Sequence, residues 1–195
     1  MKAILSELKT SVVLTLVLGL LLCGVFPLAV WAAAQAFFPD KANGSLIVDQ
    51  DGTVRGSALL AQSFTSEKYF QPRPSAAGTG YDAANSGGTN LGPTSRKLRD
   101  AIAAAVAGYR KANGLSASDP VPADAVTSSG SGLDPHISLA NAGLQAPRVA
   151  RARGLPLERV LAAVRRCTDG RSLQIFGEPG VNVLELNLAL DAVKQ

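Results

Sequence analysis

The chain has 195 residues, a formal net charge of +4 and a hydrophobic fraction of 47%. This length allows one domain of ordinary size plus a further segment, and so small a charge argues against a nucleic-acid-binding protein. One histidine and two widely separated cysteines, Cys23 and Cys167, provide no metal-ligand spacing, so we expect no metal bound by this chain. Six arginines in helical patterns are expected on solvated helix faces: Arg148, Arg151, Arg153, Arg159, Arg165 and Arg166.

The sequence from Thr10 to Pro39 has no charged residue, and about 20 apolar residues suffice for a helix to span a bilayer. We therefore expect a transmembrane helix over residues 11–34, followed by a single extracytoplasmic domain over residues 40–195. Residues 1–10 are expected in the cytoplasm, because lysines precede the span whereas Asp40-Lys41 after it is balanced. A cleaved signal peptide is the alternative, although the apolar stretch is longer than signal peptides usually carry.

Small side chains recur at every fourth position of the span, at Ser11, Thr15, Gly19 and Cys23. On a helix this spacing forms a ridge along one face, which lets two transmembrane backbones approach closely. We interpret the ridge as a contact with a membrane partner; the alternative is chance, because small residues are common in such helices. Pro27, four residues further on, is expected to kink the helix.

The domain begins with strand patterns over residues 44–48 and 53–57, joined by an Asp-Gly turn. Arg73 follows, held extended by Pro72 and Pro74, either in a plain surface loop or presented to a carboxylate or phosphate. Residues 76–93 form a long loop rich in Gly, Ser, Thr and Asn, and such loops are usually functional or disordered. This loop lacks the spacing and the lysine of a phosphate-binding P-loop.

A helix is predicted next, capped by Thr94 or Ser95 and ended by Asn113-Gly114. Helices are also predicted over residues 135–145 and 147–154, and from Pro156 onward. A strand is predicted over residues 173–176, and Asn182 is expected to cap a last helix that runs to Val193. This mixture predicts an α/β domain of the α+β type.

Residues 127–138 are the most chemically dense part of the chain and contain the only histidine, His136. Gly130 and Gly132 are expected to let another surface approach closely, and Asp134 is expected to cap a helix that Pro135 begins. This geometry suits anions and carbonyl oxygens. Ser129, Asp134 and His136 supply the residue types of a hydrolase triad, but they are too crowded in sequence to converge as one.

The chain resembles the KdpC family, the small C subunits of the bacterial Kdp potassium-transporting P-type ATPase. The resemblance covers essentially the whole chain. The residues that carry it are Tyr69-Phe70, Arg73-Pro74-Ser75-Ala76, Ser86-Gly87-Gly88, Asn90-Leu91-Gly92-Pro93, Val126 to Ser138, Arg148-Val149-Ala150 and Val181-Asn182-Val183-Leu184.

This resemblance implies an inner-membrane accessory subunit of a high-affinity potassium importer, with no catalysis of its own. The implied partners are the pore-forming, channel-like subunit and the catalytic P-type ATPase subunit, whose affinity for ATP a catalytic chaperone of this kind raises. ATP is the implied cofactor, shared with the catalytic subunit by direct contact or only indirectly. The resemblance also implies that Ser86, Gly87, Gly88 and Asn90 form a nucleotide-contacting loop.

The charge rule conflicts with direct nucleotide contact, because it places the domain outside the cell and ATP is inside. The glycine loops are then expected to dock onto a partner subunit, with Arg73, Gly130, Gly132, Asp134 and His136 as the contacting residues. One alternative is a stand-alone, membrane-anchored extracytoplasmic protein that binds a small polar ligand. Another is an anchored hydrolase, which would need a reactive serine.

Overall fold

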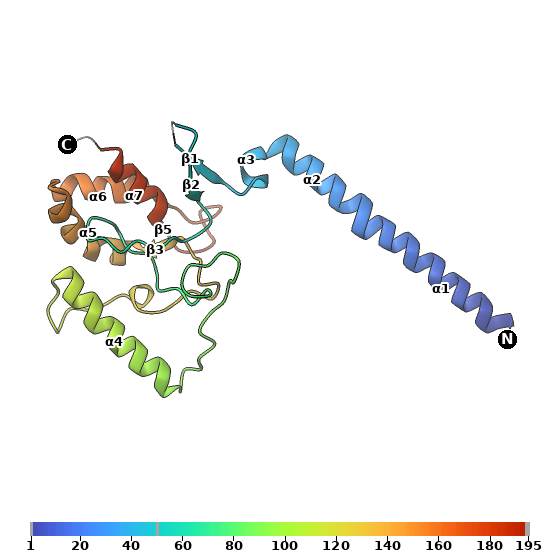
Figure 1. Ribbon diagram of the computed structural model, residues 1–195, viewed down its shortest axis with the longest axis horizontal. Coiled ribbons are helices and arrows are strands. Elements are labelled where there is room, and N and C mark those ends of the chain that lie inside the picture. Colours follow the sequence, from blue (N-terminus) through green and yellow to red (C-terminus); the bar gives the residue numbers. More distant parts are fainter. Residues whose placement is uncertain (1, 50, 194–195) are drawn as a thin grey trace. The chain divides into compact units, whose positions relative to one another are not determined.

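A computed structural model describes residues 2–49 and 51–193 of the chain (Figure 1). The chain divides into two compact units, Met1–Leu46 and Ile47–Gln195. The first unit is mostly one long helix, and the second contains both helices and small sheets.

The first unit consists of helix α1 (Lys2–Leu20), a π-helical turn η1 (Leu21–Val25), helix α2 (Phe26–Phe37) and the short helix α3 (Pro39–Ala42). The stretch Ala3–Phe37 is 35 residues long, with a mean hydropathy of 2.6 in its most apolar window, and is long and apolar enough to cross a membrane. The kink predicted at Pro27 stays a prediction. A π-helical turn lies just before this proline, and in it the Phe26 N–H donates to the Leu21 C=O, five residues earlier.

Two small sheets belong to the second unit and its junction with the first. Strand β1 (Leu46–Val48) pairs with β2 (Val54–Ser57), which confirms the hairpin predicted there. A three-stranded antiparallel sheet has the order β3-β5-β4. Its strands are β3 (His136–Ser138), β4 (Thr168–Asp169) and β5 (Gly180–Asn182).

The helices of the second unit are α4 (Arg96–Asn113), the 3-10 turn η2 (Ala123–Ala125), α5 (Leu139–Arg153), α6 (Leu157–Arg166) and α7 (Val183–Asp191). The core lies among α5, α6, α7 and the three-stranded sheet, and its buried side chains include Ile137, Val149, Val160 and Leu186. Because helices gather around short antiparallel strands, the fold is of the predicted α+β type.

Several predicted helix ends are confirmed. The Ser95 hydroxyl accepts the Leu98 N–H at the start of α4, and Gly114 ends α4 with a left-handed φ of 66°. The Asn182 side chain accepts the Glu185 N–H at the start of α7. Pro156 directly precedes α6, as predicted.

The helix predicted from Pro135 is wrong, because residues 136–138 are drawn into pairing with β5. Helix α5 begins only at Leu139, and its N-cap is Ser138 and not Asp134. The predicted break at Pro147 is also wrong: α5 runs through Pro147 to Arg153. Buried neighbours on both sides of Pro147 hold the helix together, so tertiary packing compensates for one missing backbone hydrogen bond.

The strand predicted over residues 173–176 is also wrong. These residues form a tight turn closed by a bridge between Ser172 and Phe176, and Leu173 and Gln174 adopt positive φ of 52° and 63°. The solvated position predicted for Arg148 is wrong as well, since this residue is only 4% exposed.

Residues 67–71 have no regular secondary structure and enter the core at Phe70, where buried side chains supply hydrogen bonds to the backbone. Asn187 accepts the Phe70 N–H at 2.8 Å and donates to the Phe70 C=O at 2.9 Å. Gln145 accepts the Gln71 N–H at 2.8 Å and donates to the Gln71 C=O at 3.0 Å. Each amide side chain thus replaces a neighbouring strand, which fixes the path of the chain just before Arg73.

Candidate functional site

The two glycine-rich loops singled out in the sequence lie against each other. The Gly87 N–H donates to the Ser131 C=O at 2.9 Å, and the Ser86 hydroxyl donates to the same oxygen at 3.0 Å. The Ser75 hydroxyl donates to the Gly132 C=O at 2.6 Å from a third segment. The structure therefore joins the Ser86–Gly88 loop and the Gly130–Gly132 loop into one surface.

The close backbone approach expected at these glycines occurs, but within the chain. At Gly132, whose φ is +69°, a Cβ would lie 2.7 Å from both the Ala77 nitrogen and the Gly87 oxygen. At Gly88 a Cβ would lie 3.0 Å from the Gly130 oxygen. In contrast, a Cβ at Gly130 or Gly87 would meet nothing within 4 Å, so internal packing explains Gly132 but not Gly130.

Asn90 and Ser86 are both exposed at the ends of the loop, and Asn90 has a positive φ of 53°. An asparagine tolerates this left-handed conformation better than most residues. The four residues implied to contact nucleotide therefore divide into a half-buried pair, Gly87 and Gly88, and an exposed pair that flanks it.

Arg73, Asp134, His136 and Asp169 form a chain of alternating charges beside the loops. An Arg73 guanidinium nitrogen donates to an Asp134 carboxylate oxygen at 3.0 Å. The His136 ring lies between two carboxylates, with Nδ1 3.5 Å from Asp134 and Nε2 2.8 Å from Asp169. Three of the predicted docking residues are thus brought together, and Asp169 joins them from β4, which the sequence analysis missed.

Two members of the charge chain, Asp134 and His136, have pKa values shifted in opposite directions. The hydrogen bond between Asp134 and the His136 ring lowers the pKa of Asp134 to about 2, although burial opposes this change. Arg73 lowers the pKa further. The same hydrogen bond, supported by Asp169, raises the pKa of His136, although burial opposes the change. The site therefore favours the protonated form of His136 and the ionised form of Asp134.

This arrangement does not assemble a serine hydrolase. Both His136 ring nitrogens face carboxylates, while the Ser129 hydroxyl accepts the backbone N–H of Asp134 at 3.4 Å. A catalytic serine needs its hydroxyl hydrogen-bonded to a histidine that serves as base. Among the hydrogen bonds found in residues 2–49 and 51–193, none joins a serine hydroxyl to His136.

An anion or carbonyl oxygen was expected at the start of a helix beginning with Pro135; the helix begins at Leu139 instead, and Asp124 lies at that start. Its carboxylate accepts the Ser138 N–H at 2.7 Å and the Ser138 hydroxyl at 2.9 Å. It also accepts the Asn141 side-chain amide at 3.0 Å. The positive end of α5 is therefore neutralised by a carboxylate of the same chain, a role that the sequence analysis missed because Asp124 lies fourteen residues from Ser138.

An open groove of about 440 Å³ runs along this cluster. Arg73 and His136 are the basic residues that line it, and Asp124, Asp134 and Glu178 are the acidic ones. Carboxylates thus outnumber cations, which is unfavourable for a polyphosphate and suits contact with a polar protein surface.

The small residues of the predicted ridge lie in the first unit. Ser11, Thr15 and Gly19 are in α1 and Cys23 is in the π-turn, and all four are exposed in the isolated chain. They are therefore available for contact with another helix.

An α+β domain joined to one helix long enough to cross a bilayer defines a class of single-span membrane proteins. Within that class, a family model described as "KdpC: K+-transporting ATPase, c chain" matches residues 8–192. The chain therefore belongs to the KdpC family.

Curated relatives agree with this assignment, and each is named "Potassium-transporting ATPase KdpC subunit". One from Rhodospirillum rubrum is 57% identical over 187 residues, which cover 96% of each chain. One from Mycobacterium tuberculosis strain H37Rv is 54% identical over 190 residues, which cover 97% of this chain and 98% of the relative. One from Myxococcus xanthus is 55% identical over 187 residues, which cover 96% of this chain and 86% of the relative.

The substitution Gly132→Ala tests the contact between the two loops. We expect it to lower the free energy of unfolding by about 2–3 kcal/mol, since it adds positive-φ strain to a clash with fixed backbone. Gly130→Ala is the matched control and should change that free energy by less than about 0.5 kcal/mol. Urea unfolding of the full chain in detergent, followed by circular dichroism, measures both; equal losses would show that the contact is not specific to Gly132.

Proposed function

We propose that this protein is the C subunit of a potassium-transporting P-type ATPase and assembles with its pore-forming and catalytic subunits without catalysing a reaction itself. The observation that carries this proposal is the near full-length similarity to relatives of that name, at 57% and 53% identity for two of them. The geometry of the site supports it, because a polar groove beside two joined loops suits a docking surface better than a catalytic centre.

The orientation in the membrane follows from charge. Lys2 and Lys9 flank the beginning of the apolar helix, and lysines near a span favour the cytoplasmic side. We therefore place residues 1–10 in the cytoplasm of a bacterium, residues 11–34 in its inner membrane and the domain of residues 40–195 on the extracytoplasmic side.

Any effect of the subunit on ATP affinity is then indirect. A loop outside the cell cannot reach ATP across about 30 Å of hydrocarbon, and the acidic groove beside the loops does not favour a triphosphate. The role of catalytic chaperone would arise if the domain docked preferentially on one conformational state of the pump. A coupling of this kind is typically worth about 1–3 kcal/mol.

The docking surface in this proposal is made of Ser86, Asn90, Gly130 and the charge chain that begins at Arg73. Gly130 is exposed and has open space where a Cβ would be. The backbone of a partner could therefore approach Gly130 closely. Direct nucleotide contact by residues 86–90 is the competing possibility.

The substitution Gly19→Leu tests whether the small-residue ridge binds a partner helix. A Cβ at Gly19 meets nothing within 4 Å, so leucine fits the isolated helix. We expect the variant to reach the membrane in normal amounts but to co-purify with less of the large subunits in mild detergent, because its bulk separates the two helices. Leu20→Phe enlarges a side chain on a neighbouring face of the helix and is the control. Unchanged yield of the complex with Gly19→Leu would mean that the ridge faces lipid.

Protease accessibility and ATP labelling together test the proposed topology. Protease added to sealed, right-side-out spheroplasts should digest residues 47–193 while a cytoplasmic marker stays intact. A photoreactive ATP analogue added to the purified complex should label the catalytic subunit and leave this subunit unlabelled. A protected domain with label between Ser86 and Asn90 would contradict the indirect mechanism and support nucleotide contact.

A further inference from the structure

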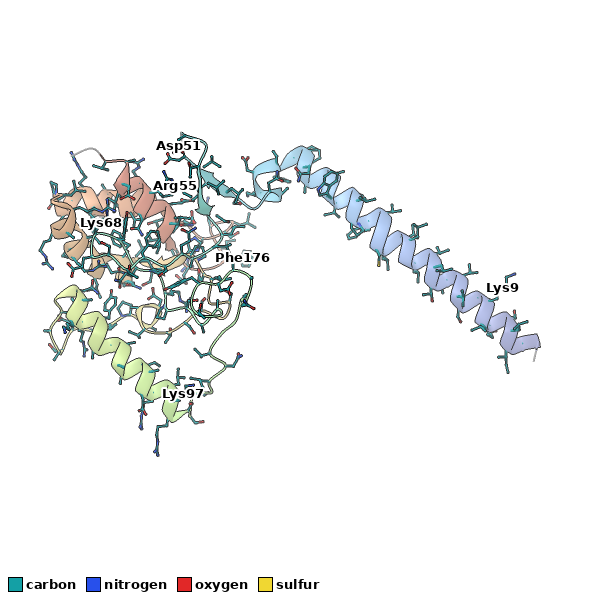
Figure 2. All side chains as sticks on the ribbon, viewed as in Figure 1. Lys9, Asp51, Arg55, Lys68, Lys97 and Phe176 are labelled. Carbon is teal, nitrogen blue, oxygen red and sulfur yellow. The ribbon has the colours of Figure 1, made fainter. Side chains whose placement is uncertain are left out.

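Residues 171–178 connect β4 to β5 and are called the apolar loop below. The tip of this loop carries three exposed apolar side chains. Leu173 is 80% exposed, Ile175 70% and Phe176 63%. Figure 2 shows Phe176 at the margin of the domain. Large side chains so exposed and so close together are unusual on a soluble surface and mark a contact site.

The apolar loop is held in one conformation by its own hydrogen bonds. Ser172 and Phe176 exchange two backbone hydrogen bonds, at 2.8 and 2.9 Å. A single Arg171 guanidinium nitrogen, Nη2, donates to both oxygens of the Glu178 carboxylate at 2.9 Å, which links the two ends of the loop. The structure thus presents the three apolar side chains even though Leu173 and Gln174 adopt unfavourable positive φ.

The base of the loop is fixed to the sheet and to the charge chain. Asp169 pairs with Gly180 across β4 and β5, and the Asp169 carboxylate also binds the His136 ring at 2.8 Å. A Cβ at Gly180 would lie 3.0 Å from the His136 Cβ, so the ring region packs tightly on the base. The base of the loop is therefore anchored to the domain.

The linker between the apolar helix and the domain is short. Helix α2 ends at Phe37 and strand β1 begins at Leu46, and the eight intervening residues can extend at most roughly 30 Å. Trp31, Phe37 and Phe38 are all exposed near the end of the apolar helix, and aromatic side chains there are typical of the membrane interface. The domain is therefore tethered a short distance from the bilayer that holds the helix.

We propose that the apolar loop inserts Leu173, Ile175 and Phe176 into the interface of the lipid bilayer that holds the chain's own apolar helix. The exposed residues Arg165 and Arg166 lie just before β4 and can meet anionic headgroups. This insertion goes beyond the subunit assignment and does not depend on that assignment, because the loop could insert from either side of the membrane.

Tryptophan fluorescence of the full chain in nanodiscs tests this insertion. The chain has one tryptophan, Trp31, so Trp31→Phe combined with Phe176→Trp gives a single reporter on the apolar loop. The nanodiscs contain phosphatidylethanolamine and phosphatidylglycerol, with or without bromine on the upper acyl carbons. The control reporter is Leu157→Trp in the same background, because Leu157 begins α6 at the end opposite Arg166, about 15 Å away along the helix.

We expect the reporter at position 176 to be blue-shifted and quenched by brominated lipid, and the reporter at position 157 to be neither. Adding Leu173→Ser and Ile175→Ser should abolish the quenching while circular dichroism stays unchanged, since each lost aliphatic side chain weakens insertion about tenfold. Absence of lipid quenching at position 176 would overturn the proposal. If the emission instead shifted only on assembly with the large subunits, without lipid quenching, the tip would bind protein.

Discussion

The domain depends on the hydrogen bonds that the buried guanidinium of Arg148 donates. It donates to Asn113 at 2.9 Å, to Gln145 at 2.8 Å, to the Tyr69 C=O at 3.0 Å and to the Glu67 C=O. Burial lowers the pKa of Arg148, yet an arginine remains protonated in a protein. No carboxylate in residues 2–49 and 51–193 forms a salt bridge with this cation, so its direct hydrogen-bond partners are neutral oxygens.

This buried network connects the core with the candidate site. Gln145, oriented by Arg148, binds both backbone groups of Gln71, and Asn187 binds both backbone groups of Phe70. Arg73 lies two residues after Gln71 and donates a hydrogen bond to Asp134, which directly follows the Gly130–Gly132 loop and Leu133 in sequence. The position of the proposed docking surface is therefore set from within the core, and we expect a change in the core to be transmitted to it.

The elements that the sequence predicted correctly depend on local chemistry. The apolar helix, the caps at Ser95 and Asn182 and the terminal Gly114 all follow from nearby residues. The errors come from long-range partners: β5 keeps His136 to Ser138 extended, and Arg148 is buried because residues 67–71 offer it carbonyl oxygens. Likewise, the glycine-rich sequence predicted a close approach of two backbones, but only the fold shows that the backbone at Gly132 packs against Gly87.

Urea unfolding of Arg148→Met, compared with Arg151→Met, tests this account most directly. Both substitutions alter the same helix, but Arg148 is buried and Arg151 is exposed. Because Trp31 lies in the apolar helix, circular dichroism of the full chain in detergent is the appropriate signal. We predict a loss of about 3–5 kcal/mol for Arg148→Met, which leaves buried oxygens unpaired, and less than about 0.5 kcal/mol for Arg151→Met. Equal effects, or a gain in stability for Arg148→Met, would contradict the account.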